Sequence, residues 1–222
     1  MTLIVAVDDL TASDAMRLTT SLCGVARGFK IGLPYILRNG ADSASLLRKE
    51  CPQALWVADL KLADIGYVMK LVASALINDV DAVIAHGFVG LRGALDELKE
   101  YLDENGKKLV VVATMSHPGA REVYDKVFPD IIGLLKRLQP WGVVVPATRP
   151  ETIAVARSEL PGSTILSPGV GAQGARPGTA LCRGADYEIV GRLITRAPDP
   201  LATARRVVAE QEEMLRKCKG LK

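Results

Sequence analysis

Residues 54–64 read Ala-Leu-Trp-Val-Ala-Asp-Leu-Lys-Leu-Ala-Asp, an apolar run that passes directly into an acid, a base and a second acid. The five apolar residues are typical of a strand that is buried on both faces of a parallel sheet. Asp59 and Lys61 are two residues apart, so they project to the same side of an extended backbone. Burial of an unpaired charge is costly, which favours pairing between these side chains or with further charges. If the strand instead ends at Ala58, they are solvated loop residues, and this stretch alone leaves both interpretations open.

Length and composition favour one globular domain. The chain has 222 residues, of which 49% are hydrophobic and 24% charged, so we expect a single domain spanning 1–222. The net charge of +3 is small and the basic residues are not interleaved with aromatic ones, so nucleic acid is not an expected partner. We find no apolar run near the roughly 18 residues of a membrane span and no signal-peptide pattern, so we expect a cytoplasmic protein without a membrane partner.

The four cysteines are far apart in the sequence. Their spacing matches neither a zinc site nor a dense disulfide framework, so we expect buried thiols. These residues are Cys23, Cys51, Cys182 and Cys218.

Apolar runs alternate with amphipathic stretches along the whole chain, a pattern typical of a parallel sheet with crossover helices. Eight such units in 222 residues fit a single-domain (β/α)8 TIM barrel of the α/β class, and an open doubly wound sheet is the alternative. The expected strands are 3–7, 28–31, 55–59, 82–86, 109–114, 142–145, 164–167 and 187–190.

Helix signals lie between these strands. Thr11 and Asp14 have the spacing of a capping box that opens a helix. Pro129 interrupts 121–139, which predicts two shorter helices there. One expected helix carries apolar residues at the spacing of a single buried face. These residues are Ile65, Val68, Met69, Val72, Ala73 and Leu76.

A barrel places its functional groups at the carboxyl ends of several strands. Polar or motif residues do recur at these points, whereas the uncharged sixth strand, 142–145, is expected to contribute packing only. The residues at the strand ends are Asp8, Lys30, Asp59, Lys61, His86, Ser116, Pro168, Gln173 and Arg192.

A glycine-rich segment after the seventh strand points to a phosphorylated ligand. Residues 167–174 read Ser-Pro-Gly-Val-Gly-Ala-Gln-Gly, and Gly191-Arg192 follows the eighth strand. Small residues let backbone N–H groups approach an anion, and an arginine fork binds phosphate through two hydrogen bonds. A glycine-rich turn alone is more often only a turn. Together with Gly191-Arg192, it matches the usual phosphate position of such barrels.

These motifs resemble the orotidine 5′-monophosphate decarboxylase family, in its short archaeal form, over essentially the whole chain. The D-x-K-x-x-D element is shared with sugar-phosphate enzymes of the same barrel superfamily, whereas the motifs at 115–119 and 167–174 are more specific. The matching segments are Ala6-Val7-Asp8, Phe29-Lys30-Ile31-Gly32, Asp59-Leu60-Lys61-Leu62-Ala63-Asp64-Ile65, His86-Gly87-Phe88, Met115-Ser116-His117-Pro118-Gly119, Ser167-Pro168-Gly169-Val170-Gly171-Ala172-Gln173-Gly174 and Val190-Gly191-Arg192.

The resemblance implies cofactor-independent decarboxylation of orotidine 5′-monophosphate to uridine 5′-monophosphate and CO2, without a metal, in the last step of de novo pyrimidine nucleotide synthesis. It makes Lys61 the proton donor at C6 and puts Asp59 beside the substrate carboxylate. Lys30 and Asp64 complete the catalytic charge array. In this family the residues matching Asp64 and Ile65 enter the neighbouring subunit's site, which implies a homodimer with shared active sites.

The remaining implied contacts bind the substrate. Asp8 is assigned to a ribose hydroxyl and Ser116 to the pyrimidine ring. The phosphate side is assigned to Pro168, Gly169, Gly171, Gln173, Gly191 and Arg192, with 168–178 as the lid. The chain departs from the family at Val68, where a threonine often contributes a ribose contact that valine cannot make.

Two other functions stay open at this point. One is a Mg²⁺-dependent sugar-phosphate lyase of the same superfamily, and the other is a non-catalytic barrel that senses pyrimidine nucleotides. A metal site at His86 or His117 is the less favoured interpretation, because a lone histidine at a strand end is more often a hydrogen-bonded structural residue.

Overall fold

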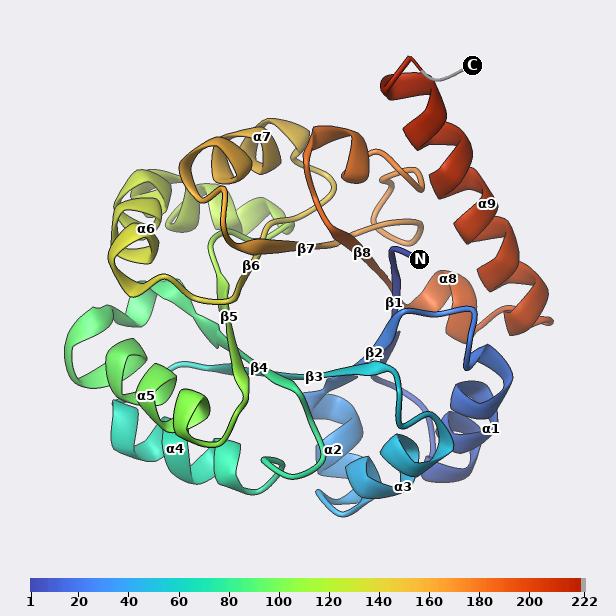
Figure 1. Cartoon of the computed structure of the whole chain (residues 1–222), viewed down its shortest axis with the longest axis horizontal. Coiled ribbons are helices and arrows are strands. Elements are labelled where there is room, and N and C mark those ends of the chain that lie inside the picture. Colours follow the sequence, from blue (N-terminus) through green and yellow to red (C-terminus); the bar gives the residue numbers. More distant parts are fainter. Residues whose placement is uncertain (221–222) are drawn as a thin grey trace.

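Eight short parallel strands close into a barrel in the computed structural model, which describes residues 1–220. The strands follow one another around the ring in sequence order, and β8 pairs with β1 (Figure 1). This confirms the expected TIM barrel and rules out the open sheet. The strands are β1 (Leu3–Val7), β2 (Gly28–Gly32), β3 (Leu55–Leu62), β4 (Ala82–His86), β5 (Lys108–Val112), β6 (Gly142–Val144), β7 (Thr164–Pro168) and β8 (Tyr187–Val190).

Helices surround the ring of strands in Figure 1. Apolar strand residues are buried on both faces, as β1 shows with five buried residues in a row. The helices are α1 (Ala12–Leu22), α2 (Leu33–Asn39), α3 (Ser43–Glu50), α4 (Gly66–Ser74), α5 (Asp96–Glu104), α6 (Tyr124–Leu138), α7 (Pro150–Glu159), α8 (Arg192–Thr195) and α9 (Pro200–Cys218). Shorter helical turns are η1 (Gly87–Val89), η2 (Leu91–Leu95), η3 (Pro118–Arg121) and η4 (Leu181–Arg183). None of the helices in residues 1–220 has the length and apolar character to cross a membrane.

The first helix begins where the capping signal predicts. The Thr11 hydroxyl accepts a hydrogen bond from the Asp14 backbone N–H at 3.2 Å and donates one to the Asp14 carboxylate at 2.7 Å. The first of these bonds satisfies one of the free N–H groups at the start of α1.

The prediction of two helices around Pro129 is wrong, because α6 is continuous and contains this proline. Proline inside a helix removes one backbone hydrogen bond and costs about 3 kcal/mol. Helix α6 buries Ile131, Ile132 and Leu135 against the barrel, and this apolar burial outweighs the local penalty.

The single buried face expected for the helix after β3 is also wrong in part. Met69 and Ala73 are buried in α4, and Leu76 is buried just after it. Ile65 and Val72, however, are 60% and 41% exposed. Because α4 is apolar on two sides, spacing alone could not separate its core face from its outer face.

The four cysteines form two disulfides, so the expectation of buried thiols is wrong. Cys23–Cys51 joins the end of α1 to the end of α3, with a Cα–Cα distance of 5.6 Å. Cys182–Cys218 joins η4 to the end of α9, with a Cα–Cα distance of 5.9 Å. The partners are 28 and 36 residues apart in sequence and meet only because the barrel brings these elements together.

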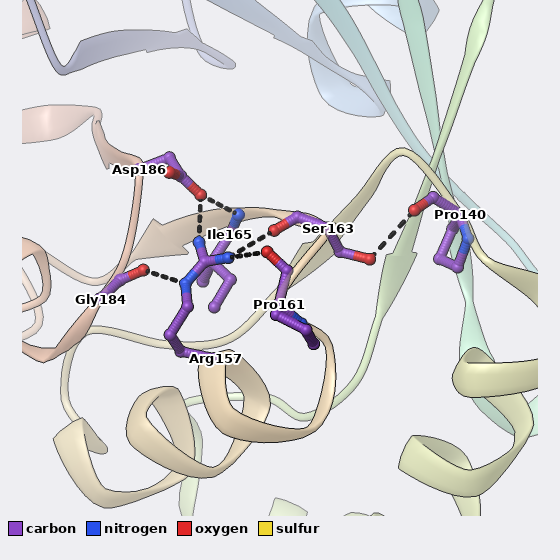
Figure 2. Close-up of polar contacts among 7 residues, drawn as sticks. All are labelled: Pro140, Arg157, Pro161, Ser163, Ile165, Gly184 and Asp186. Carbon is purple, nitrogen blue, oxygen red and sulfur yellow. Dashed lines mark hydrogen bonds and ion pairs between the residues drawn. The ribbon is translucent and has the colours of Figure 1, made fainter.

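The amino ends of β7 and β8 are tied together by Arg157 on α7 (Figure 2). Its guanidinium donates to the backbone carbonyls of Gly184 at 2.9 Å and of Pro161 and Ser163 at 3.0 Å. It also pairs with Asp186, whose carboxylate accepts the backbone N–H of Ile165 at 2.7 Å. These contacts lie at the end of the barrel opposite the functional side chains, so they serve the stability of the fold.

Candidate active site

Asp59 and Lys61 lie within β3, which continues to Leu62. The expected end of this strand at residue 59 is therefore too early, and the solvated-loop interpretation is wrong. Pairing with β4 shifts register between Ala58 and Leu62, and Lys61 has a φ of 45°. Positive φ is uncommon for a residue other than glycine, and such strain is concentrated at functional sites.

The two side chains extend into an ionic array. One oxygen of Asp59, Oδ2, lies 2.7 Å from Lys61 Nζ and 3.0 Å from Lys30 Nζ. Lys30 Nζ lies 2.9 Å from Asp8 Oδ1, so acids and bases alternate from Asp8 to Lys61. The other oxygen of Asp59, Oδ1, is buried and has no hydrogen-bond partner among the described residues. Below, we call these four residues the ionic array.

The backbone of β2 leaves room for the array. Gly32 lies opposite Asp59 in the parallel ladder between β2 and β3. A Cβ atom at Gly32 would be 1.9 Å from Asp8 Oδ1 and 3.3 Å from Lys30 Nζ. Any larger residue at this position would therefore displace the Asp8 carboxylate.

Burial and charge act in opposite directions on the array. Burial favours the neutral carboxyl of Asp59, but the ammonium groups of Lys30 and Lys61 outweigh it and hold the pKa of Asp59 below its ordinary value. Burial likewise disfavours the charged amine of Lys30, but the carboxylates of Asp59 and Asp8 raise its pKa above the ordinary value. Asp59 and Lys30 are therefore both ionised at neutral pH, although they are 7% and 6% exposed.

His86, at the end of β4, belongs to an aromatic cluster beside the array. Its Nδ1 shares a hydrogen bond with the Tyr124 hydroxyl, and its ring stacks on Phe88 with 4.8 Å between centroids. Burial, and then the charge of Lys61, lower the pKa of His86. The imidazole is accordingly neutral at pH 7. Within residues 1–220, His, Cys, Asp and Glu side chains do not gather in groups of three or more that could hold a metal ion.

Two adjoining cavities open beside the array and share Lys30, Asp59 and Lys61 in their walls. The polar cavity has a volume of about 390 Å³ and the apolar cavity about 250 Å³. The polar cavity is also lined by Asp8, Pro168, Gly169, Gln173, Gly191 and Arg192. The apolar cavity includes Ser116, Ile84, Val112, Thr114, Val144 and Pro146. One elongated ligand can therefore place a charged end and an apolar end on either side of the array. A larger hollow of about 470 Å³ lies beyond Ser116, and none of the array residues lines it.

Three predicted site residues do not line these cavities. Asp64 and Ile65 are exposed on the segment between β3 and α4. Gly171 lies in the loop after β7 with a φ of 78°, and a Cβ there would be 2.7 Å from Leu193 Cδ2. This glycine lets the loop pack closely on the start of α8.

The sequence interpretation missed Thr114 and the contribution of the sixth strand. The Thr114 hydroxyl is buried, lines the apolar cavity and has no partner among the described residues. Val144 and Pro146 also form part of the cavity wall, so the sixth strand does more than pack the core. Thr114 lies two residues after the end of the buried strand β5, and this position at a carboxyl end is the signal that could have identified it.

A closed parallel barrel with an ionic array and a ligand cavity at the carboxyl ends of its strands defines an enzyme of the TIM-barrel class. The model of the orotidine 5′-phosphate decarboxylase / HUMPS family matches residues 1–207. The chain belongs to this family.

Proteins similar to this chain are named orotidine 5′-phosphate decarboxylase. The chain is 50% identical over 209 residues to the orotidine 5′-phosphate decarboxylase of Aeropyrum pernix, covering 92% of this chain and 86% of that protein. It is 42% identical over 190 residues to that of Sulfurisphaera tokodaii, covering 86% and 87%. The solved structure of the enzyme from Sulfolobus solfataricus has a TM-score of 0.85 and 37% identity, covering 96% and 98% of the two chains. The enzyme from Methanocaldococcus jannaschii complexed with inhibitor BMP has a TM-score of 0.88 and 29% identity over the same shares.

Proposed function

We propose that Lys30, Asp59 and Lys61 of the ionic array, together with Asp64, form the catalytic centre of an orotidine 5′-monophosphate decarboxylase. In this proposal Asp8 binds the substrate. As a member of this family, the chain is a carboxy-lyase that converts orotidine 5′-monophosphate into uridine 5′-monophosphate (UMP) and CO2, the last step of de novo pyrimidine nucleotide synthesis. The observation that carries the assignment of the centre is the pair of cavities that meet at Asp59 and Lys61.

The two cavities suit the two ends of this substrate. In our proposal the phosphate occupies the polar cavity, where Arg192 provides a planar fork of donors and Gln173 and Gly191 provide further contacts. Pro168, Gly169 and Gly171 shape the loop on this side. Asp8 accepts a ribose hydroxyl, and the pyrimidine enters the apolar cavity beside Ser116.

The chemistry follows from the charges beside the ring. The bond between C6 and the carboxylate breaks, its electron pair stays on C6, and the Lys61 ammonium supplies the proton that C6 takes up. Asp59 faces the departing carboxylate, and two negative charges about 4 Å apart repel by roughly 4 kcal/mol at an effective dielectric near 20. This repulsion disappears as neutral CO2 forms, while the attraction between Lys61 and C6 grows. Lys30 holds Asp59 ionised, and no metal or organic cofactor takes part.

Replacement of Lys61 tests the assignment. Loss of a positioned proton donor costs about 10² to 10⁴-fold in rate, so Lys61→Ala should lose at least about a hundredfold in kcat. UMP should still bind, as measured by calorimetry. Lys99→Ala is a matched control, because Lys99 pairs with Asp103 on the surface of α5. Near-normal turnover by Lys61→Ala would refute its role.

Substrate and metal dependence test the activity itself. Turnover is followed as loss of pyrimidine absorbance with orotidine 5′-monophosphate, with and without EDTA. We expect equal rates in both. Inactivity on this substrate would overturn the assignment, and EDTA-sensitive turnover would favour a metal-dependent lyase of the same barrel superfamily.

A homodimer with shared sites is the second part of the proposal. Asp64 and Ile65 are exposed and do not line the cavity of their own chain. Apolar side chains around them are exposed too, with Tyr67 at 63% and Leu71 at 55%. Contiguous exposed apolar surface marks interaction sites. We propose that this surface pairs with a second copy and carries Asp64 and Ile65 to the partner's site, with Val68 making no ribose hydrogen bond.

Mixed dimers test this arrangement sharply. Lys61→Ala and Asp64→Ala homodimers should both be nearly inactive, because each lacks one residue at every site. After unfolding and refolding together, half of the dimers should combine one chain of each kind, and one of their two sites is then intact. The mixture should recover about a quarter of the wild-type activity under random pairing. If Asp64 serves its own chain's site, no activity returns.

We also propose that the chain functions as one catalytic domain in the cytoplasm, without nucleic-acid or membrane partners. The proposed domain spans 1–222, and its last two residues lie outside the described residues. Cell fractionation with an activity assay tests the location.

A further inference from the structure

We propose that Glu188 and Gln211 are positioning residues that hold the carboxyl-terminal stem of the phosphate loop, residues 168–178, at the correct distance from Arg192. The inference rests on the phosphate-binding role proposed above. Neither residue lines the polar cavity, so both would act through the loop.

Glu188 points away from the cavity into a buried space outside the barrel. Its neighbour Ile189 on β8 lines the cavity, and successive side chains of a strand face opposite sides. The Glu188 carboxylate is completely buried. Oε2 accepts the Gly178 backbone N–H at 2.8 Å and the Gln211 side-chain amide at 3.0 Å, and Oε1 accepts the Ala180 backbone N–H at 3.0 Å.

Among the described residues, the hydrogen-bond partners of this carboxylate are N–H groups and none is a cation. Burial raises the pKa of Glu188, since desolvation disfavours the charged form. An apolar residue would avoid this cost but would leave the amides of Gly178 and Ala180 without acceptors. The carboxylate therefore fixes the position of the loop backbone at Gly178 and Ala180, where the loop ends.

Helix α9 supports Glu188 through Gln211 and packs against the same stem at Gly178. Gln211 lies on α9, and its side-chain oxygen accepts the Thr2 hydroxyl at 2.9 Å. Gly178 has a φ of 85°, and a Cβ there would lie 2.5 Å from Met214 Cβ on α9. The loop backbone thus packs against the helix with no space for a side chain, and Glu188 binds it from the barrel side.

Strand β8 thus connects the anchor of the loop to the arginine of the phosphate site. Four residues after Glu188, Arg192 lines the polar cavity at the start of α8. The loop enters at Pro168, whose carbonyl accepts the Ala147 N–H at 2.8 Å, and leaves at the stem held by Glu188. Gln173 lies between these two anchored ends and reaches the cavity. Release of the stem would let Gln173 move relative to Arg192 without disturbing the ionic array.

The test compares a nucleotide with its nucleoside. Calorimetry measures the Kd of UMP and of uridine, and steady-state assays measure KM and kcat. For Glu188→Leu we expect the Kd of UMP and the KM to rise about tenfold, as for loss of a hydrogen-bonded anchor, with uridine binding and kcat within about twofold. Glu188→Gln keeps one acceptor oxygen and should fall between the wild type and Glu188→Leu.

Two further variants separate the possible failures. Thr2→Val removes the outer hydrogen bond of the same cluster and should lower stability without changing the ratio of UMP to uridine affinity. Arg192→Ala should weaken UMP binding specifically. If it does not, the proposed phosphate site itself is wrong. If Arg192→Ala behaves as expected while Glu188→Leu weakens both ligands equally, lowers kcat alone or leaves binding unchanged, the positioning role is overturned. Should Glu188→Leu fail to fold, Glu188→Gln and Gln211→Met provide the same comparison.

Discussion

Reduction of the Cys23–Cys51 bond should lower the free energy of unfolding by about 3.6 kcal/mol. The bond closes a loop of 28 residues and so reduces the chain entropy of the unfolded state, and this loss of entropy corresponds to the stated value at 25 °C. Cys182–Cys218 closes 36 residues and is worth about 3.8 kcal/mol on the same basis. The loops do not overlap in sequence, so the losses should add to about 7 kcal/mol. In a chain of 222 residues each loss corresponds to about 8 °C in Tm.

The assay is guanidinium unfolding of oxidised and reduced protein at one protein concentration, because association changes apparent stability. Protein that was unfolded, reduced and refolded under reductant is compared with oxidised protein. The variant Cys23→Ser with Cys51→Ser should lose only the first contribution when oxidised. Under reductant its free energy of unfolding should match that of the reduced wild type, apart from the effect of serine on packing at Cys51, which is 1% exposed.

Two results would refute this account. Thiol titration of the unfolded, unreduced protein should detect no free thiols, and detection of four would show that the bonds do not form. If the bonds form but the oxidised and reduced proteins unfold at the same guanidinium concentration, loop closure does not contribute to stability. Disulfides also occur in intracellular proteins of hyperthermophilic archaea and bacteria, so their presence does not conflict with the proposed cytoplasmic location.

Three further predictions concern separate parts of the barrel. Arg157→Ala should lower the free energy of unfolding by about 2 to 3 kcal/mol, because Asp186 and several carbonyls lose their hydrogen-bond donor. Its kcat/KM should not change, and a loss of activity in fully folded protein would contradict the separation of the two barrel ends. Gly32→Ala should displace the Asp8 carboxylate and lower kcat/KM about tenfold or more, and a normal rate would show that this acid is dispensable. The pKa of His86 lies below 6.5 in the folded protein, so the unfolded chain binds more protons and stability falls as pH drops below 6.5. His86→Gln should therefore lose less stability than the wild type between pH 7 and pH 5 in guanidinium titrations, and equal losses would exclude this contribution.

The strands were predictable because each barrel strand is a short apolar run, which can be recognised without knowing its contacts with other parts of the chain. Asp59 and Lys61 were predictable for a related reason: charges at the end of such a run are costly without a partner. The disulfides were not, because sequence spacing does not reveal that α1 lies beside α3. The path of α6 through Pro129 likewise depended on tertiary burial that local propensity does not contain.

Hydrogen bonds between residues far apart in the sequence were the hardest to predict. Glu188 follows Tyr187 in an ordinary strand, and nothing in its neighbours indicates three N–H donors from a loop and from α9. Thr114 was missed because a hydroxyl at a strand end is common. Local sequence identifies a buried polar group only when burial of that group has a large free-energy cost and the group lies where the fold places functional residues.

The irregular pairing of β3 with β4 has a consequence for how this chain can change in length. Ala58 pairs with Val83 and Leu62 with Ala85, so four steps along β3 match two along β4. Removal of two residues from this interval would give an even ladder and would also remove the local bend that contains Lys61. The more regular barrel is thus one without the irregular turn of backbone that presents Lys61, the proposed proton donor. We expect natural and designed variants to tolerate insertions and deletions in the outer loops while keeping the length of 58–62 fixed.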